Sequence, residues 1–426
     1  MQAERADELA LIMHRAVKIA TDPPAGPVFV GLPIDVMEQE TDQAPLAPGR
    51  LHRAPAPDPA GVAEAAALLL GGRRPVIVAG DDAAPAAAEL LALAERLGAA
   101  VWCEGIRARQ AVPSRHPNFR LSLPFDAVAI RRALDEADVV LLVGGPFFEE
   151  VWYAPGSPLP PGAAAIHVET SPERLAHNLP VTVGLVSEPR AALFALRSAV
   201  EREAGDAFRA AAATRNEALQ ALKAQDAQAQ RARAAKRWDS APISMPRLMA
   251  EVESALPDDA IVVDEAITAG PDLARTIQFE RAGDYVGARG GGIGQALPGA
   301  IGIKLARPDR PVVALSGDGS AMYSIQALWT AAHHDLAIAF VILNNREYRI
   351  LKHNMDTYRQ RFGAKPDRGY PNMDLVSPDL GFVDIARGLG VEGMRVGHPA
   401  ELRPALERDL GAGRPFLLDV AIEGRP

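Results

Sequence analysis

A carboxylate and a carboxamide follow two apolar segments of this sequence at a fixed spacing. The first segment, Val312–Ser316, runs into Gly-Asp-Gly-Ser at 317–320, and the second, Phe340–Leu343, runs into Asn-Asn at 344–345. Aspartate and asparagine side chains offer the oxygen ligands that Mg²⁺ takes, and magnesium usually completes its shell with substrate phosphates and water. The two motifs therefore predict a site for a hard cation and for the diphosphate that it neutralises.

The segments around these motifs determine whether they meet. Apolar runs bounded by glycine or polar residues are typical of strands buried on both faces. Between them, Ala321–Asp335 carries apolar residues at helical spacing, which predicts a helix and hence a right-handed parallel crossover. Both motifs then lie at the carboxyl edge of one sheet, where open α/β folds bind ligands. A helix beginning near Ser320 would direct free N–H groups toward a phosphate.

Each motif alone is more typical of an ordinary turn, because glycine and aspartate dominate turns for conformational reasons. Together, with 27 residues from Asp318 to Asn345, they resemble the diphosphate-binding signature of thiamine diphosphate enzymes. The resemblance covers nearly the whole chain and is with the pyruvate oxidase, decarboxylase and acetolactate synthase superfamily, above all with the benzoylformate decarboxylases. The segments that carry it are 26–35, 114–120, 290–298 and 317–332.

The resemblance implies an α/β fold with two doubly wound parallel-sheet domains and an N-terminal remnant of a third. Alternating apolar strands and alanine-rich helices support the same reading. We expect strands at 76–79, 100–103, 139–143, 165–168, 182–186 and 261–265, and helices at 246–256 and 296–306. The expected parts are a remnant of the pyrimidine-binding domain (1–38), a linker (39–60), a middle Rossmann-like domain (61–200), a connecting helix or linker (201–242) and a thiamine diphosphate and magnesium-binding domain (243–426).

The resemblance also assigns site residues. It implies that thiamine diphosphate and Mg²⁺ are held by Thr268, Gly291, Ile293, Gly317, Asp318, Gly319, Ser320, Asn345, Glu347 and Tyr348. Of these, Asp318, Asn345 and the backbone carbonyl of Glu347 would bind the metal. The carbonyl of Gly291 would accept a hydrogen bond from the pyrimidine amino group, and Ile293 would support the bent cofactor. Without the family motif, Ile293 could equally be an ordinary core residue and Thr268 the start of a helix.

Two departures from the family limit the expected activity. The chain begins at what would be the last helix (16–20) and strand (27–32) of the first domain, and the glutamate that activates the pyrimidine ring has no counterpart. Where relatives place a histidine in the middle domain, this chain has Val151. Glu149 or Glu150 could substitute, although a solvated acidic loop is the commoner explanation. We therefore leave the catalytic residues unassigned, as we do His333 and His334.

Composition excludes several other classes of protein. A net charge of −9 without a basic cluster argues against nucleic acid as a partner. The single cysteine, Cys103, excludes a disulfide framework and is expected in the core. With no signal peptide pattern and no run long enough to span a membrane, we expect a cytoplasmic protein without a membrane partner. The glycines of the middle domain lack the spacing of a dinucleotide fingerprint, so we expect no FAD there.

Two functional hypotheses remain open at this stage. The first is a thiamine diphosphate and Mg²⁺ dependent lyase acting on a small 2-keto acid, similar to benzoylformate decarboxylase or, as a carboligase, to acetolactate synthase. The second is a non-catalytic cofactor-binding or assembly subunit. The resemblance further implies a homodimer or homotetramer, and a chain that supplies the pyrimidine-binding domain could be required.

Overall fold

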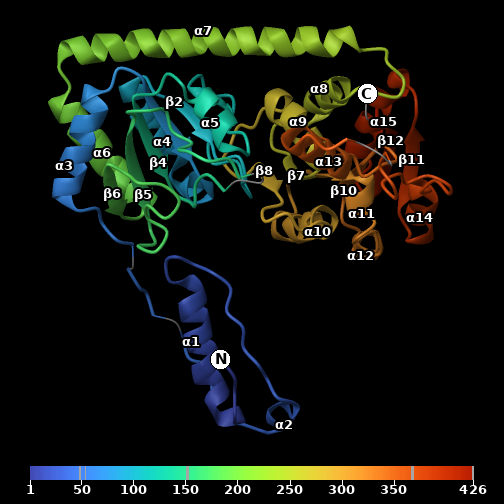
Figure 1. Ribbon diagram of the computed structural model, residues 1–426. Coiled ribbons are helices and arrows are strands. Elements are labelled where there is room, and N and C mark those ends of the chain that lie inside the picture. Colours follow the sequence, from blue (N-terminus) through green and yellow to red (C-terminus); the bar gives the residue numbers. More distant parts are fainter. Residues whose placement is uncertain (48, 53, 150–152, 366–368, 425–426) are drawn as a thin grey trace.

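Two parallel six-stranded sheets, each flanked by helices, form most of the molecule (Figure 1). The computed structural model describes residues 1–47, 49–52, 54–149, 153–365 and 369–424. The strands of the first sheet are β1 (Pro75–Ala79), β2 (Ala100–Cys103), β3 (Phe119–Ser122), β4 (Val139–Val143), β5 (Ala164–Glu169) and β6 (Val183–Val186). Those of the second are β7 (Ile261–Glu265), β8 (Tyr285–Gly287), β9 (Val312–Gly317), β10 (Ile338–Asn344), β11 (Glu392–Val396) and β12 (Phe416–Ala421).

The first sheet has the order β3-β2-β1-β4-β5-β6, the doubly wound arrangement predicted for the middle domain. The central strands β1 and β4 are buried along their whole length, as their continuous apolar sequences predict. Cys103 is fully buried in the same core, which confirms its predicted core position, and burial raises the pKa of its thiol. The strand order changes direction between β1 and β4.

The second sheet has the order β11-β12-β10-β9-β7-β8. Strands β9 and β10 are parallel neighbours, and Gly317 pairs with Leu343 in their register. The crossover predicted between the two motifs is thus confirmed, and the 317–320 and 344–345 segments leave the sheet at the same edge.

The helices cover both faces of each sheet and join the two domains. The longer ones are α1 (Leu9–Thr21), α3 (Pro59–Gly71), α4 (Ala87–Leu97), α6 (Pro189–Glu203), α7 (Asp206–Lys236), α8 (Met245–Ala255), α10 (Ala296–Ala306), α13 (Arg349–Phe362) and α15 (Pro399–Leu410). The shorter ones are α2 (Ile34–Met37), α5 (Ala127–Ala133), α9 (Gly270–Thr276), α11 (Asp318–Ala321), α12 (Ala327–His333), α14 (Phe382–Gly388) and the 3₁₀ turns η1 (Ala6–Glu8), η2 (Asp81–Ala86) and η3 (Ile267–Ala269). None of the described helices has the length and apolar character needed to cross a bilayer.

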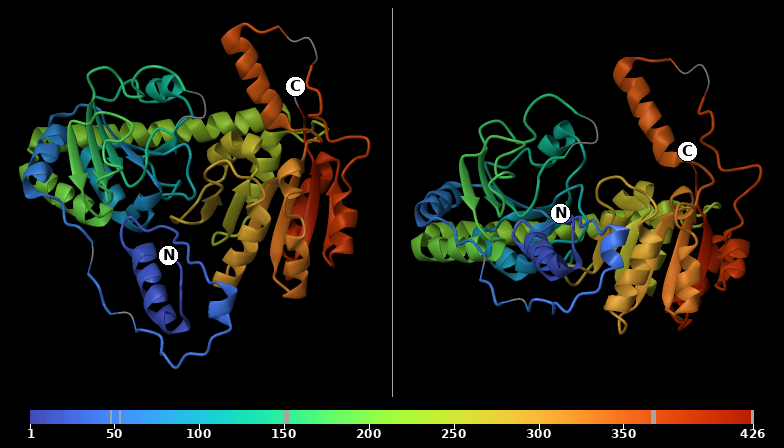
Figure 2. Two further views of the ribbon diagram at one scale, coloured as in Figure 1. Left: turned by 60° about the horizontal axis from the view of Figure 1, so that its bottom comes forward. Right: turned by 90° about the horizontal axis from the view of Figure 1, so that it is seen from below.

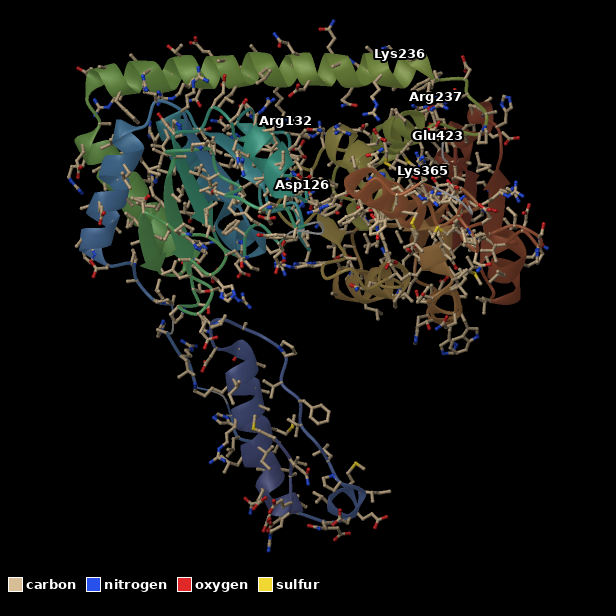
Figure 3. The ribbon with its side chains drawn as sticks, in the orientation of Figure 1. Asp126, Arg132, Lys236, Arg237, Lys365 and Glu423 are labelled. Atoms are coloured by element: carbon tan, nitrogen blue, oxygen red, sulfur yellow. The ribbon has the colours of Figure 1, made fainter. Side chains whose placement is uncertain are left out.

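Helix α7 runs past both sheets as a single straight element (Figure 1). It matches the predicted connecting helix, and only Ala212 and Ala234 are buried along it. Its carboxyl end is tied to the second domain by an ion pair between Arg237 and Glu423, whose Nη1 and Oε2 atoms lie 2.5 Å apart (Figure 3). The helix therefore bridges the two domains while most of its surface faces solvent.

Two local expectations are wrong. No strand forms over 27–32, where only Gly31 bridges to Gln2, because the described residues place no further strand beside it. The helix expected over 321–335 is interrupted. Residues 322–326 form turns between α11, which ends at Ala321, and α12, which begins at Ala327. Ser244 occupies the N-cap position of α8; its hydroxyl donates to the carbonyl of Arg237, and the carboxylate of Glu423 accepts the first helical N–H, that of Met245, at 3.3 Å.

The first 38 residues form a small unit of their own, below the two sheets in Figure 1 and away from the tip of α13 in Figure 2. Its core consists of Ala3, Ile12 and Val36. Several large apolar side chains stay exposed, among them Phe29 at 82% and Ile34 at 73% of their surface.

Candidate cofactor site

The residues predicted to hold the cofactor follow four strands that are successive neighbours in the second sheet. Asn345 and Glu347 follow β10, the 317–320 segment ends β9, Thr268 follows β7, and the glycine segment 290–294 follows β8. Because all these strands are parallel, the four segments emerge at one edge. The structure thus brings the predicted residues to the same carboxyl edge of one sheet.

Asp318 is buried, and each of its two carboxylate oxygens accepts a hydrogen bond from a backbone N–H group. Its Oδ1 accepts a hydrogen bond from the N–H of Gly319 at 2.7 Å, and its Oδ2 accepts one from the N–H of Arg346 at 2.7 Å. Burial raises the pKa of this carboxyl to about 6, although the backbone donors oppose the rise. A divalent cation would favour the charged form of such a group.

Asn345 is partly buried beside it. Its Oδ1 accepts a hydrogen bond from the N–H of Glu347 at 3.0 Å, which fixes the direction of the carboxamide. The carbonyl of Glu347, the predicted third ligand, accepts a hydrogen bond from the N–H of Arg349 at 2.9 Å. Carbonyl and carboxamide oxygens each have a second lone pair, so both retain capacity for a metal.

The side chain of Glu347 forms an ion cluster that the sequence did not predict. The Lys352 ammonium donates to Glu347 and, at 2.5 Å, to Oδ1 of Asp374. Glu347 and Lys352 are both buried, at 8% and 7% exposure. The cluster ties the loop after β10 to residues 373–375, where the N–H of Tyr348 donates to Met373 and the N–H of Leu375 donates to Arg346.

Tyr348 lies at the N-cap of α13 with its ring against Gly319. A Cβ atom at Gly319 would come within 2.7 Å of Cε1 of this ring, so glycine is required for the close approach. Ser320, also buried, is part of the single-turn helix α11. Thr268 lies in the 3₁₀ turn η3 after β7 and is partly buried.

The glycine segment after β8 has the backbone freedom that the sequence indicated. Gly290, Gly291 and Gly294 have φ values of +88°, +73° and +92°, which side chains rarely adopt. Gly294 also approaches Tyr323 so closely that a Cβ would lie 2.7 Å from its Cβ. Ile293 is half-buried and outside the buried apolar clusters of the described residues, which is against an ordinary core role.

Glu265 and Arg289 fix the two ends of this segment, and sequence reasoning assigned neither. The carboxylate of Glu265, at the end of β7, accepts hydrogen bonds from the N–H groups of Gln295 and Ala296 at 3.0 and 3.1 Å. The sequence does contain a signal for Glu265: an acidic residue at the end of a strand can accept hydrogen bonds from the first N–H groups of a helix. Arg289 reaches across to Asp81 and Glu149 of the first sheet's domain. Glu150 and Val151, proposed for the position of the family histidine, lie outside the described residues.

The space at this edge is compatible with a diphosphate and its metal. A Cβ atom built at Gly317, Gly290 or Gly291 would meet no atom within 4 Å. Among the described residues no three His, Cys, Asp or Glu side chains gather to hold a metal by themselves. The predicted ligands are one carboxylate, one carboxamide and one carbonyl, and such an incomplete set suits Mg²⁺ bound together with phosphate oxygens.

Two family descriptions match the two sheet domains. Residues 62–196 match "Thiamine pyrophosphate enzyme, central domain", and residues 269–420 match "Thiamine pyrophosphate enzyme, C-terminal TPP binding domain". The benzoylformate decarboxylase of Pseudomonas aeruginosa is 33% identical over 97% of this chain and 74% of its own length. The chain belongs to the thiamine pyrophosphate enzyme family.

Other relatives belong to the same family but differ in activity. The acetolactate synthase large subunit IlvG of Mycobacterium tuberculosis is 32% identical over 98% of this chain and 72% of its own length. Among solved structures, the thiamine diphosphate-dependent 4-hydroxybenzoylformate decarboxylase of Rhodococcus jostii RHA1 matches all of this chain and 76% of its own, with 29% identity and a TM-score of 0.80. Decarboxylases and acetolactate synthases are thus both among its relatives.

Proposed function

We propose that this chain is a thiamine diphosphate and Mg²⁺ dependent lyase that decarboxylates a 2-keto acid in the cytoplasm, with a site similar to that of benzoylformate decarboxylase. The observation that carries the proposal is the meeting of Asp318 and Asn345 at the carboxyl edge of β9 and β10, with open space at Gly317. When bound, thiamine diphosphate would supply the electron sink for cleavage of the bond to the carboxylate.

The chain's own residues would orient that cofactor. Asp318, Asn345 and the carbonyl of Glu347 would hold Mg²⁺, and Thr268 and Ser320 would lie beside the diphosphate. Gly291 would accept the hydrogen bond of the pyrimidine amino group, with Ile293 beneath the bend. Tyr348, at the start of α13 and beside Gly319, would close the pocket over the diphosphate.

Calorimetry of the purified chain with thiamine diphosphate tests this assignment. We expect binding that requires Mg²⁺ and that falls at least about a hundredfold in Asp318→Ala, since a charged ligand to a metal is lost. Asp309→Ala removes an exposed carboxylate of the same domain and should bind as the wild type does. Equal binding by Asp318→Ala and the wild type would refute the cofactor site.

A non-catalytic or assembly role is the second candidate, and the exposed apolar surface of residues 1–38 favours it. Phe29 and Ile34 expose most of their side chains, and this segment resembles part of a pyrimidine-binding domain. A homodimer, a homotetramer or a chain that supplies that domain would cover this surface. The glutamate that activates the pyrimidine has no counterpart in this sequence, so we propose weak or no turnover by the chain alone.

Turnover assays separate these candidates. Release of carbon dioxide from benzoylformate by this chain alone would eliminate the non-catalytic role. Formation of a 2-hydroxy-2-methyl-3-keto acid from pyruvate would favour an acetolactate synthase-like carboligase. Cofactor binding without either product would favour a cofactor-binding subunit.

A further inference from the structure

Arg289 connects the glycine segment to the other domain. It is the residue directly before Gly290, and its guanidinium contacts two carboxylates of the middle domain: Nη1 lies 3.1 Å from Oδ2 of Asp81, and Nη2 lies 2.7 Å from Oε2 of Glu149. The Arg289 side chain is 26% exposed, Asp81 11% and Glu149 43%. One cation thus joins a largely buried and a half-exposed carboxylate across the domain boundary.

Asp81 is itself held rigidly. It follows Gly80 at the carboxyl end of β1, and its carboxylate also accepts hydrogen bonds from the N–H groups of Ala108 and Arg109 at 2.9 to 3.1 Å. An exposed ion pair between two mobile side chains contributes little, since both lose conformational freedom. Here one partner is already fixed by backbone donors, so Arg289 meets a preorganised acceptor.

The backbone supports the same contact. The N–H of Gly287 donates to the carbonyl of Ala108 at 2.8 Å, and the N–H of Gln110 donates to Tyr285 at 3.3 Å. Arg109 and Val286 form an antiparallel bridge. The middle domain therefore fixes the backbone of β8 as far as Gly287, three residues before Gly290.

The first two glycines of the segment have few contacts of their own, whereas Gly294 packs against Tyr323 and the carbonyl of Gly292 accepts a hydrogen bond from the Gln295 side chain at 2.9 Å. Gly290 and Gly291 have positive φ, and neither has an atom within 4 Å of its Cβ position. Glycine loses more conformational entropy on ordering than any other residue. The conformation of Gly290 and Gly291 therefore depends on the contacts that flank them, which are those of Arg289 on one side and those of Gly294 and of the N–H groups held by Glu265 on the other.

We propose that Asp81 and Glu149 are positioning residues. By holding Arg289 they set the conformation of the glycine segment, and this conformation determines how tightly the pyrimidine half of thiamine diphosphate binds. The inference rests on the proposed function for its ligand. It assigns the middle domain an indirect part in cofactor binding, in which its residues act without touching the cofactor.

Two probes test the proposal on the full chain. Thiamine diphosphate contacts both ends of the site, whereas inorganic pyrophosphate fills only the diphosphate end. In Arg289→Met we expect the calorimetric Kd for thiamine diphosphate with Mg²⁺ to rise about tenfold and that for pyrophosphate to stay unchanged.

Glu149→Gln, which alters a half-exposed side chain and should fold normally, should raise the thiamine diphosphate Kd about threefold. Arg307→Met, at an exposed arginine of the same domain, should change neither.

Hydrogen exchange of the free chain supplies a readout that needs no cofactor. Amides of 290–294 should exchange faster in Arg289→Met and Glu149→Gln than in the wild type and in Arg307→Met. Unchanged exchange in this segment, or equal weakening of both ligands, would overturn the positioning role. Failure of the wild-type chain to bind thiamine diphosphate, with the exchange difference present, would instead refute the proposed function and the cofactor part of this inference.

Discussion

Oδ2 of Asp318 lies 2.7 Å from the backbone nitrogen of Arg346 and accepts its hydrogen bond. This contact joins the segment after β9 to the loop after β10. Oδ1 of the same carboxylate accepts the N–H of Gly319. A single buried side chain therefore fixes both loops that would surround a metal. Its replacement should change the stability of the fold as well as the affinity for the metal.

Asp318→Asn should flatten the dependence of stability on pH even without ligand. Burial raises the pKa of the Asp318 carboxyl to about 6 in the folded chain, so part of the stability of the wild type is lost as pH rises through that value, whereas the carboxamide has no proton to release. The carboxamide also has one acceptor oxygen for two N–H donors, so one donor loses its partner at a cost of about 1 to 3 kcal/mol at every pH. Urea denaturation from pH 5 to 7.5 measures the two slopes, with Asp309→Asn as the exposed control, and an equal slope for variant and wild type would refute the prediction.

Gly319→Ala and Gly317→Ala should differ in stability although only one residue separates them. A Cβ at Gly319 would meet the Tyr348 ring at 2.7 Å, so the ring must move, and we expect a loss of about 1 to 3 kcal/mol. Gly317 has φ −68° and nothing within 4 Å of its Cβ position, so its variant should stay within about 0.5 kcal/mol of the wild type. Thermal denaturation of both proteins decides this, and equal losses would contradict the close packing of Tyr348.

Glu104 should make stability fall as pH rises. It is buried at the end of β2, and burial raises its pKa from 4.5 to about 7 in the folded chain. Between these two values the folded state holds a proton that the unfolded state has released, so stability is greatest below the unfolded pKa and is lost as pH rises through the folded pKa. Glu104→Gln should remove roughly 2 to 3 kcal/mol of the decline between pH 5 and 8.

The comparison requires denaturation curves for both proteins across that range. The glutamine side chain of this variant keeps the shape of the glutamate but leaves one of two N–H donors, from Gly105 or Phe148, without an oxygen acceptor. The informative quantity is therefore the difference in slope against pH, and parallel pH profiles would contradict the prediction.

Lys352→Met should destabilise the chain by about 3 kcal/mol at neutral pH, because it removes the Lys352 ammonium from the buried carboxylate of Glu347. Lys352→Arg keeps the charge and should recover most of that loss. Lys365→Met changes an exposed lysine beyond the end of α13 (Figure 3) and should have little effect. Equal stability of Lys352→Met and Lys365→Met, measured by urea denaturation, would exclude a stabilising role for the ion cluster.

The sequence predicted best what depends on local pattern. Helix α10 occupies Ala296–Ala306 as expected, and the apolar runs before Asp318 and Asn344 form adjacent parallel strands. Buried strands and amphipathic helices leave a periodic signal, and the crossover rule then places their ends.

Contacts between distant residues could not be predicted in this way. Arg289 and Asp81 are 208 positions apart, and no local pattern indicates that they meet. The ring of Tyr348 against Gly319 and the pairing of Lys352 with Asp374 likewise depend on how loops cross above the sheet. Helix propensity failed at Met322–Gln326, where close packing of Tyr323 on Gly294 overrides the helical spacing.

The pairing of residues 108–110 with β8 also determines how the second sheet meets other proteins. A bare strand edge is a template for further strands and hence for aggregation. On one side, the middle-domain segment covers β8, and on the other, β11 exposes the charged side chains of Glu392 and Arg395. The middle domain therefore shields one edge of the second sheet, and a second domain expressed alone would present the backbone of β8 unpaired on that side.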